Sequence, residues 1–326
     1  MANYILSDGP EIGAFIAGLE ETSAKKWSLL WRMGHANVAK WRRVTNYFLF
    51  PLQFILGHRH IGRVVAWQQF YGITTAFYNR LLPLHRDMRI TVMTFIYKPK
   101  AGLAGRVYHH FVETALASGN VKDVIVFSRS EVEYYAGLFP KAAHKFRYIP
   151  LGIADMSDIA TRRGDYIFTA GVSNRDYDFL FEALGGTDYR VRIACPGVRV
   201  PHGVTNIEML EDCYGDRMLH ELAGCRAVVI PLKDRNISSG QLMLLQAMQM
   251  GKPVIVTRTD ALTEYVEDGR TALFIDNKPD QLRDALNRLE TDQQLYDSLA
   301  ENARRKVSEE FSERKLGEHI GGFCSL

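Results

Sequence analysis

From the N-terminus to about residue 150, short apolar runs alternate with longer segments in which apolar residues recur at helical spacing. A regular alternation of strands and helices predicts a parallel sheet whose strands are joined by crossover helices, the doubly wound α/β arrangement. The clearest helices are expected at 104–118 and 131–139. We expect strands at 4–6, 28–32, 63–67, 90–95, 123–127 and 146–149.

A polar, turn-rich stretch, GIADMSDIATRRGD at 152–165, interrupts this alternation, which then restarts. We therefore expect an N-terminal domain over 1–152 and a C-terminal domain over 153–326, each with its own sheet. Ligands of such sheets bind at the carboxyl ends of the strands, where loops open into helices. The second sheet is expected to contain strands at 166–169, 191–194, 227–231 and 253–257.

The stretch NISSGQLMLLQAMQMGKPVIV, residues 236–256, combines a polar turn, a short run of helix formers and a β-branched strand. Ser238, Ser239 and Gly240 precede the expected helix, so its first amides and the positive end of its dipole are available to an anion. Gly251 ends the helix. Three apolar residues at helical spacing are expected in the core: Leu242, Leu245 and Met248.

A second loop of this kind follows the strand at 166–169, in TAGVSNRDYDFLF. Gly171 lets the backbone approach a ligand, and Arg175, near Ser173, can hold a phosphate bidentately. Serine before a helix is more often a simple N-cap, so either loop alone is weak evidence. Two helix starts aimed at one crevice make a diphosphate the natural ligand.

The composition, 47% apolar and 24% charged residues over 326 positions, is that of a globular chain long enough for two domains. The four cysteines are widely separated, so neither a disulfide framework nor a metal cluster is expected. The N-terminus lacks the basic and apolar regions of a secretory signal. The longest apolar run, 47–56, contains Pro51 and is about half the ~20 residues that a membrane-spanning helix needs. We expect a cytoplasmic protein.

Positive charge is concentrated at 22–112, which carries fourteen Lys or Arg and a single acid, Asp87. The segment is +13 and the rest of the chain −10, which suggests an anionic partner for the first half. We favour a peripheral contact with an anionic membrane surface, where cations meet headgroups and indoles lie at the boundary. Nucleic acid, or a filled core with a solvated basic face, is the alternative. All four tryptophans fall in this segment: Trp27, Trp31, Trp41 and Trp67.

Five motifs in series resemble those of GT-B glycosyltransferases, especially glycosyltransferase family 4: FSRSEVEYYAGLF, KFRYIPLGI, AGVSNRDYDFLFEAL, GCRAVVIPLKD and LLQAMQMGKPVIVTRTDALTEYVEDGRTALFI. The resemblance covers 123–311, and the first 120 residues only through their alternation. It implies two Rossmann-like domains facing across a cleft. It also implies a UDP- or GDP-linked sugar bound by the second domain, an acceptor bound by the first, and neither a metal nor a cofactor.

The family's glycine and basic residue after the first strand of the second domain match Gly171 and Arg175, with Ser173 beside them. Met209 and Leu210 fall where backbone groups hold the base in the family. Lys233, after the VVIPL strand, falls near the expected position of a cation that meets the diphosphate; a solvated loop lysine is the alternative.

Family 4 commonly has two glutamates that contact the donor sugar and the ribose, and this chain has Ser238 and Gln246 there. Gln246 keeps a carbonyl acceptor that can hold a ribose hydroxyl. Ser238 is short and uncharged, so the sugar contact is expected from the amides of Ser239, Gly240 and Gln241, or from Asp234.

In the first domain, the family's histidine that faces the donor sugar is replaced by Tyr97-Lys98, either of which could supply a polar group. An inverting reaction needs a base near the acceptor hydroxyl. Asp8, at the end of the first strand, is the candidate that topology favours, with a helix-capping role as the alternative.

These features predict a glycosyltransferase that moves a sugar from a nucleoside diphosphate to an acceptor. A lipid-linked saccharide in cell-surface polysaccharide synthesis is the acceptor that the basic, tryptophan-rich segment favours. A non-hydrolysing nucleotide-sugar epimerase and a non-catalytic scaffold at a membrane surface are the alternatives. The final GEHIGGFCSL, residues 317–326, is expected to be a frayed tail.

Overall fold

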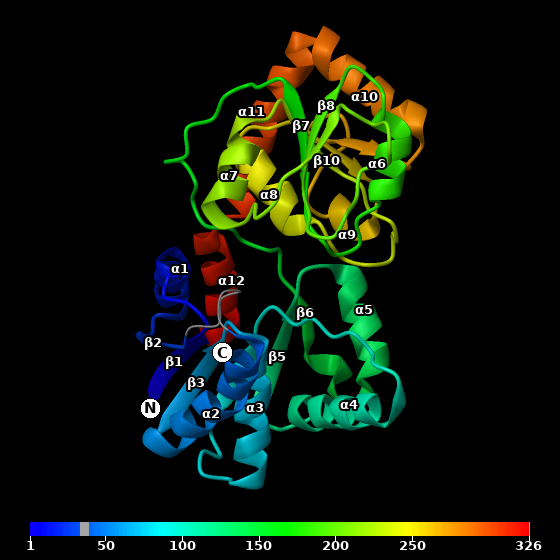
Figure 1. The fold of residues 1–326 in the computed structure, drawn as a ribbon. Helices are drawn as coiled ribbons and strands as arrows, with labels where there is room; N and C mark the ends of the chain where they lie inside the picture. The colour runs from blue at the N-terminus through cyan, green and yellow to red at the C-terminus, as the bar shows by residue number, and fades with distance from the viewer. Residues whose placement is uncertain (33–38, 326) are drawn as a thin grey trace. The chain divides into compact units, whose positions relative to one another are not determined.

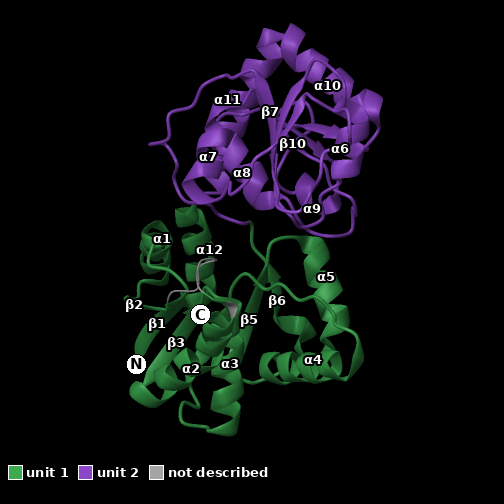
Figure 2. Cartoon of the chain, viewed as in Figure 1, with its two compact units in different colours: residues 1–150, 313–326 green, residues 151–312 purple. Residues whose placement is uncertain are grey.

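The computed structural model describes residues 1–32 and 39–325, which form two compact units (Figures 1 and 2). Unit 1 consists of Met1–Pro150 and Glu313–Leu326, and unit 2 of Leu151–Ser312. Each unit contains a six-stranded parallel sheet with helices on both faces, as the sequence predicted. The last residues of the chain pack with unit 1, although the prediction grouped all of 153–326 together.

The sheet of unit 1 has the strand order β2-β1-β3-β4-β5-β6. All six strands predicted between residues 4 and 149 are present. Their bounds are β1 Ala2–Ser7, β2 Trp27–Trp31, β3 Ile61–Ala66, β4 Arg89–Val92, β5 Val121–Val126 and β6 Phe146–Tyr148.

Alternating strand residues of unit 1 bury two faces. Leu6, Val64 and Val92 belong to the larger cluster, which packs against α2 to α5. Ile5 and Val65 face the other way, toward α1 and α12. The helices are α1 Gly13–Ser23, α2 Lys40–Gly57, α3 Gln69–Leu81, α4 Gly102–Leu116, α5 Arg129–Leu138 and α12 Glu313–Ser325, and a 3-10 turn covers Pro140–Lys145.

The predicted frayed tail is wrong, because residues up to Ser325 form α12; Leu326 lies outside the described residues. Leu316 and Ile320 of α12 are buried against Phe15 and Leu19 of α1. This apolar face gives the last helix a partner nearly 300 residues away in sequence. The hydrophobic effect therefore orders a segment that looks like a polar, glycine-rich terminus.

The sheet of unit 2 has the strand order β12-β11-β10-β7-β8-β9. The four predicted strands are present as β7, β8, β10 and β11. Two strands of three residues each, β9 and β12, were not predicted, because they are too short to show a period. The bounds are β7 Tyr166–Ala170, β8 Arg190–Ala194, β9 Ile207–Met209, β10 Ala227–Ile230, β11 Val254–Thr257 and β12 Leu273–Ile275.

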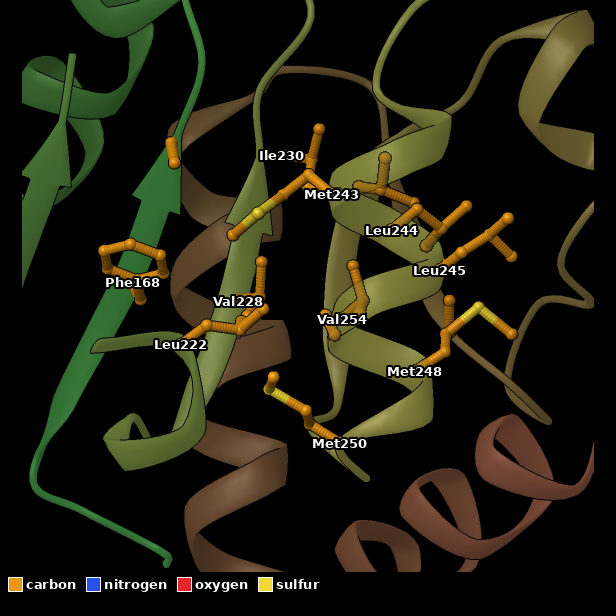
Figure 3. Close-up of a cluster of buried hydrophobic side chains, with 14 of the residues drawn as sticks. Phe168, Leu222, Val228, Ile230, Met243, Leu244, Leu245, Met248, Met250 and Val254 are labelled. Atoms are coloured by element: carbon orange, nitrogen blue, oxygen red, sulfur yellow. The ribbon is translucent and has the colours of Figure 1, made fainter. Parts of the chain in front are cut away.

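Helices cover both faces of this sheet. Leu245 and Met248 of α8 lie in the core against Val228 and Val254, as Figure 3 shows. Leu242, predicted to be buried with them, is 54% exposed, because it lies on the outer side of the helix. The helices are α6 Tyr177–Leu184, α7 Gly215–Gly224, α8 Gln241–Gln249, α9 Asp260–Thr263, α10 Pro279–Thr291 and α11 Gln293–Glu310.

Over residues 1–32 and 39–325, no helix is both long and apolar enough to span a bilayer. The four cysteines are buried and free of disulfide bonds. No group of three or more His, Cys, Asp or Glu side chains in the same residues is arranged to hold a metal ion.

Candidate functional site

The order of strands in unit 2 reverses between β7 and β10. From β7 the chain proceeds to β8 and β9 on one side, and then returns to build β10, β11 and β12 on the other. Ligands of open α/β sheets bind at such a switch point, beyond the carboxyl ends of the strands. The two loops that follow β7 and β10 carry most of the predicted donor residues.

Asn174 joins these two loops. Its Oδ1 accepts a hydrogen bond from the backbone amide of Asp234 at 2.8 Å, and its Nδ2 donates to the Asp234 carbonyl at 2.8 Å and to Ser239 Oγ at 3.0 Å. The Asn174 carbonyl also accepts from the amide of Lys233 at 3.2 Å. The loop after β7 and the loop before α8 are therefore held as one polar assembly.

The side chain of Arg175 stabilises the loop after β7 through hydrogen bonds to two backbone carbonyls. Its Nε donates to the Ala170 carbonyl at 3.1 Å and its Nη1 to the Ser173 carbonyl at 3.0 Å. The guanidinium lies against Gly171, and its burial lowers the pKa of Arg175. Nη2 has no hydrogen-bond partner among the described residues, so part of the fork remains for an anion.

The first turn of α8 has no side-chain cap. Its N-cap residue is Gly240, in the left-handed region with φ +94°. Ser238 Oγ instead accepts from Nε2 of Gln241 at 2.5 Å, and Ser239 Oγ accepts from Asn174. The predicted alternative, a serine N-cap, is therefore absent. The first amides of α8 keep their capacity to bind an anion.

Gln246 lies one turn further along α8. Its Oε1 is buried and accepts no hydrogen bond from any described residue. Leaving a buried acceptor unpaired costs free energy, so this oxygen suits a ligand hydroxyl. Gln249 Oε1 is also buried and unpaired, although its Nε2 donates to Asp155 at 3.4 Å.

A cavity of about 280 Å³ lies at the carboxyl ends of β8 and β9. Met209 and Leu210, the predicted base-binding residues, line it together with Cys195 and Glu211. The Leu210 amide already donates to the Ile193 carbonyl at 2.9 Å, so it is occupied by the sheet. The other backbone groups in the loops after β8 and β9 remain available to a planar base.

The loop after β10 is exposed. The side chain of Lys233 reaches solvent, while the Asp234 carboxylate accepts from the amide of Asn236 at 2.9 Å. Lys233 is thus held by its backbone beside Asn174, and its side chain is exposed. A point charge of this kind can meet a phosphate without fixed geometry.

In unit 1, the strand order reverses between β1 and β3, and Asp8 follows β1 at that point. Asp8 Oδ2 lies 3.5 Å from Nε2 of Gln68, which follows β3. Asp8 does not cap α1, whose N-cap residue is Ile12 and has no side-chain cap. The carboxylate therefore occupies a ligand-binding position of the fold rather than a helix terminus.

Tyr97 lies in an aromatic cluster and is only 4% exposed. Its ring stacks on Tyr108 with centroids 5.3 Å apart, and its hydroxyl lies 3.1 Å from His109 Nδ1. Its amide donates to the Tyr135 hydroxyl at 3.1 Å, and burial raises the pKa of Tyr97. These contacts assign Tyr97 to the core of unit 1, whereas Lys98 beside it is exposed.

The tryptophans divide between core and surface. Trp27 is 8% exposed and donates from Nε1 to Ser23, and Trp67 packs edge-on against Phe15. Trp31 and Trp41 are exposed. The predicted set of four interfacial indoles is therefore wrong for Trp27 and Trp67. Residues 33–38 of the basic segment lie outside the described residues.

Two asparagines in the site were not predicted. Asn277, after β12, donates from Nδ2 to the Leu232 carbonyl at 2.8 Å and accepts from the Thr257 hydroxyl. Both Asn174 and Asn277 have φ near +56°, a conformation that asparagine adopts more readily than most residues. For Asn174, its position in the loop after a predicted strand was the available signal, whereas Asn277 follows β12, which was not predicted. The partners of both asparagines are distant in sequence.

Residues 203–306 match the family model of glycosyl transferases, group 1. An uncharacterized glycosyltransferase of Methanocaldococcus jannaschii is 26% identical over 171 residues. That alignment covers 48% of this chain and 48% of the relative, so it spans about half of the relative's length.

Solved structures with the same fold align over the whole chain. The crystal structure of Anabaena HepE with UDP has a TM-score of 0.67, with 15% identity and 100% of both chains covered. Sucrose-phosphate synthase from Thermosynechococcus elongatus also has a TM-score of 0.67, with 13% identity and 99% and 98% covered. WaaG, a glycosyltransferase involved in lipopolysaccharide biosynthesis, has a TM-score of 0.62, with 14% identity and 100% of both chains covered. At these identities the likeness concerns the fold.

Proposed function

We propose that the chain, which has the GT-B fold and matches the family model of group 1 glycosyl transferases over residues 203–306, transfers a sugar from a nucleoside diphosphate to an acceptor. The observation that carries the proposal is the Asn174 linkage, which holds the loop after β7 beside the uncapped start of α8. Two sets of anion-binding groups thereby meet at the switch point of unit 2.

Each part of the donor has a place in this arrangement. The first amides of α8, the free Nη2 of Arg175 and the ammonium of Lys233 receive the diphosphate. Gln246 Oε1 accepts from a ribose hydroxyl, and the cavity beside Leu210 receives the base. UDP is the preferred nucleotide, since the HepE structures contain UDP and UDP-glucose.

Transfer develops negative charge on the leaving diphosphate. The amides of α8 and the Arg175 guanidinium, which are already oriented, stabilise this charge without reorganising, and this is the main electrostatic contribution available here. The substitution of serine at 238 leaves the sugar to the amides of Ser239, Gly240 and Gln241, or to Asp234. In unit 1, we assign Asp8 as the carboxylate that would accept the proton of the acceptor hydroxyl.

A thermal-shift titration with UDP, GDP and UDP-glucose tests the donor site. Ligands that bind the native state raise Tm, and we expect UDP to do so. Gln246→Ala should weaken UDP binding about tenfold by removing one hydrogen bond. The control is Gln249→Ala on the same helix, which should bind UDP like the wild type. No shift with any nucleotide would refute the proposal.

The fate of the nucleotide sugar in the absence of an acceptor distinguishes a transferase from an epimerase and from a scaffold. An epimerase would isomerise the donor sugar with no acceptor present, and a scaffold would neither hydrolyse nor transfer it. The transferase is expected to release nucleoside diphosphate slowly without acceptor and faster with it. Rapid interconversion of donor sugars in the absence of acceptor would favour the epimerase.

We further propose that unit 1 contacts an anionic membrane surface and that the acceptor is lipid-linked. Helix α2 exposes Trp41, Val44 and Phe48 along one side, and α4 exposes Leu103 and Val107. The two helices meet through the rings of Phe48 and Phe111, with centroids 6.2 Å apart. Exposed apolar side chains gathered in this way mark an interaction surface.

Cations accompany these apolar residues. The guanidinium of Arg42 lies 5.2 Å from the ring of Trp41, Arg43 on the same helix is half-buried, and Arg106 is exposed on α4. Arginine beside tryptophan suits a bilayer interface, since the cation meets phosphate while the indole enters the boundary.

Co-sedimentation with vesicles tests this surface. Binding is expected with phosphatidylglycerol vesicles and not with phosphatidylcholine alone. The double variant Trp41→Ser, Phe48→Ser should lose most of it, whereas Tyr134→Ser, an equally exposed aromatic on α5, should not. Equal sedimentation with both vesicle types would contradict the proposal.

A further inference from the structure

Two adjoining cavities lie at the amino ends of the strands of unit 1, the edge opposite to Asp8 and Gln68. Their volumes are about 330 and 680 Å³, and both are lined by Arg63, Arg89 and Lys122. They belong wholly to unit 1, so they are separate from the nucleotide site proposed in unit 2. Neither the family resemblance nor the proposed function accounts for them.

Strand register places the charged residues on one face. Arg63 of β3 is paired with Arg89 of β4, and Thr91 of β4 is paired with Asp123 of β5. Further along the same face, the strands bury Val65 and Ile125 under α1 and α12. Helix α12 covers only the apolar part of this sheet face. The charged part of the face, next to the C-terminal end of α12, therefore forms the cavities.

The lining is strongly positive. Paired arginines on adjacent strands repel each other, and such pairs persist only where something offsets the repulsion. Among the residues that the structure describes, Asp87 and Asp123 are the only acids in the walls. The six cations that line the two cavities are Lys25, Arg63, Arg86, Arg89, Lys122 and Arg147.

Three of these cations contact backbone carbonyls or a carboxylate of the protein. Lys25 Nζ donates to the Cys324 carbonyl at 2.5 Å, Arg63 Nη1 donates to the Phe323 carbonyl at 3.5 Å, and Arg147 lies 3.6 Å from Asp123. Burial, and then repulsion from Arg63 and Arg89, lowers the pKa of Lys25. Burial raises the pKa of Asp123, while the nearby charges of Arg147, Arg63 and Lys122 act in the opposite direction. An excess of positive charge remains.

We propose that this pocket binds a small soluble anion that carries two or more phosphate groups. Four of the six cations are arginines, whose planar donors match phosphate oxygens bidentately. Several cations converging on one hollow favour a multivalent anion over a monovalent one. Bound there, the anion would link β3, β4 and β5 to the end of α12.

Calorimetric titration with inorganic pyrophosphate, at ionic strength matched with sodium chloride, tests the pocket. The test variant is Arg86→Gln, Lys122→Gln, because both side chains are exposed in the walls. The control is Arg80→Gln, Lys141→Gln, which removes the same charge from exposed positions of unit 1 outside the pocket. We expect the pocket variant to bind pyrophosphate about tenfold or more weakly, and the control to bind like the wild type.

Circular dichroism checks that each variant is folded; if the double variant is not, Lys122→Gln alone serves. Equal pyrophosphate affinity in the pocket variant and the control would overturn the proposal and place any binding elsewhere, for example at α8. Absence of binding by the wild type would overturn it as well.

Discussion

At the residue scale, Asn174 determines how the proposed nucleotide site is assembled. Three of its four hydrogen bonds to the loop after β10 come from the side-chain amide, at distances of 2.8 to 3.0 Å. Its left-handed backbone conformation aims that amide across the switch point. An ordinary loop residue in sequence thus becomes the connection between two anion-binding segments.

Asn174→Gly removes the amide while keeping a residue that accepts positive φ. We expect the unfolding free energy to fall by about 1.5–4.5 kcal/mol, since three side-chain hydrogen bonds are lost and each contributes about 0.5–1.5 kcal/mol. Nucleotide affinity should fall about tenfold, because α8 is no longer held beside the loop after β7. Urea denaturation and calorimetry measure the two effects. Unchanged affinity with reduced stability would mean that the linkage is only structural.

Lys145 is a buried cation with a different role. Its Nζ donates to the carbonyls of Leu116 and Ser118 at 2.8 and 2.7 Å, which closes the end of α4. Burial, with a smaller contribution from Lys122, lowers the pKa of Lys145 from 10.5 to about 8. Between these two values the unfolded chain binds more protons than the folded one.

The contribution of Lys145 to stability should therefore rise with pH between about 8 and 10.5. Lys145→Met lacks this titration, so the stability difference between wild type and variant should grow in favour of the wild type over that interval. Urea denaturation at several pH values measures it. The control is Lys141→Met at an exposed position, whose stability should change with pH as that of the wild type does. If the stability of Lys145→Met ran parallel to that of the wild type over this interval, the lowered pKa of Lys145 would be contradicted.

At the element scale, glycines determine how α12 docks. A Cβ on Gly317 would lie 2.1 Å from the Phe15 carbonyl oxygen, and one on Gly18 would lie 2.2 Å from the Arg314 carbonyl oxygen. The backbones of α1 and α12 are thus in direct contact. Only residues without a side chain permit this approach, which is why the glycine-rich end is a helix and not a frayed tail.

Gly317→Ala should destabilise the protein by about 1–3 kcal/mol through overpacking, despite the higher helix propensity of alanine. Gly322→Ala on the same helix is the control, since nothing lies within 4 Å of its Cβ position. That control should be neutral or more stable by up to about 1 kcal/mol. Thermal or urea denaturation compares them, and similar effects of both changes would argue against the close contact.

At the scale of the whole molecule, the chain leaves unit 1 at Pro150 and returns to it at Glu313. Unit 1 is therefore incomplete without the C-terminal helix, because Phe15 and Leu19 of α1 lose the apolar face that covers them. A chain that ends at Ser312 should keep unit 2 folded and lose cooperative unfolding of unit 1. Hydrogen exchange would locate the loss, and full protection of β1 and α1 in that chain would refute the dependence.

The sequence by itself determined the alternation of strands and helices, ten of the twelve strands in the described residues, and the start of α8; the other predicted helix start, that of α6, is capped by the Asp176 carboxylate and is not open to an anion. These features depend on local periodicity and turn chemistry, which neighbouring residues specify. The tertiary structure alone decided which side chains are buried, as with Tyr97 and Trp27, and which are exposed, as with Leu242. It also decided the Asn174 linkage, the return of α12 and the cationic pocket. Each of these joins residues that lie tens or hundreds of positions apart, and only packing and strand register bring such residues together.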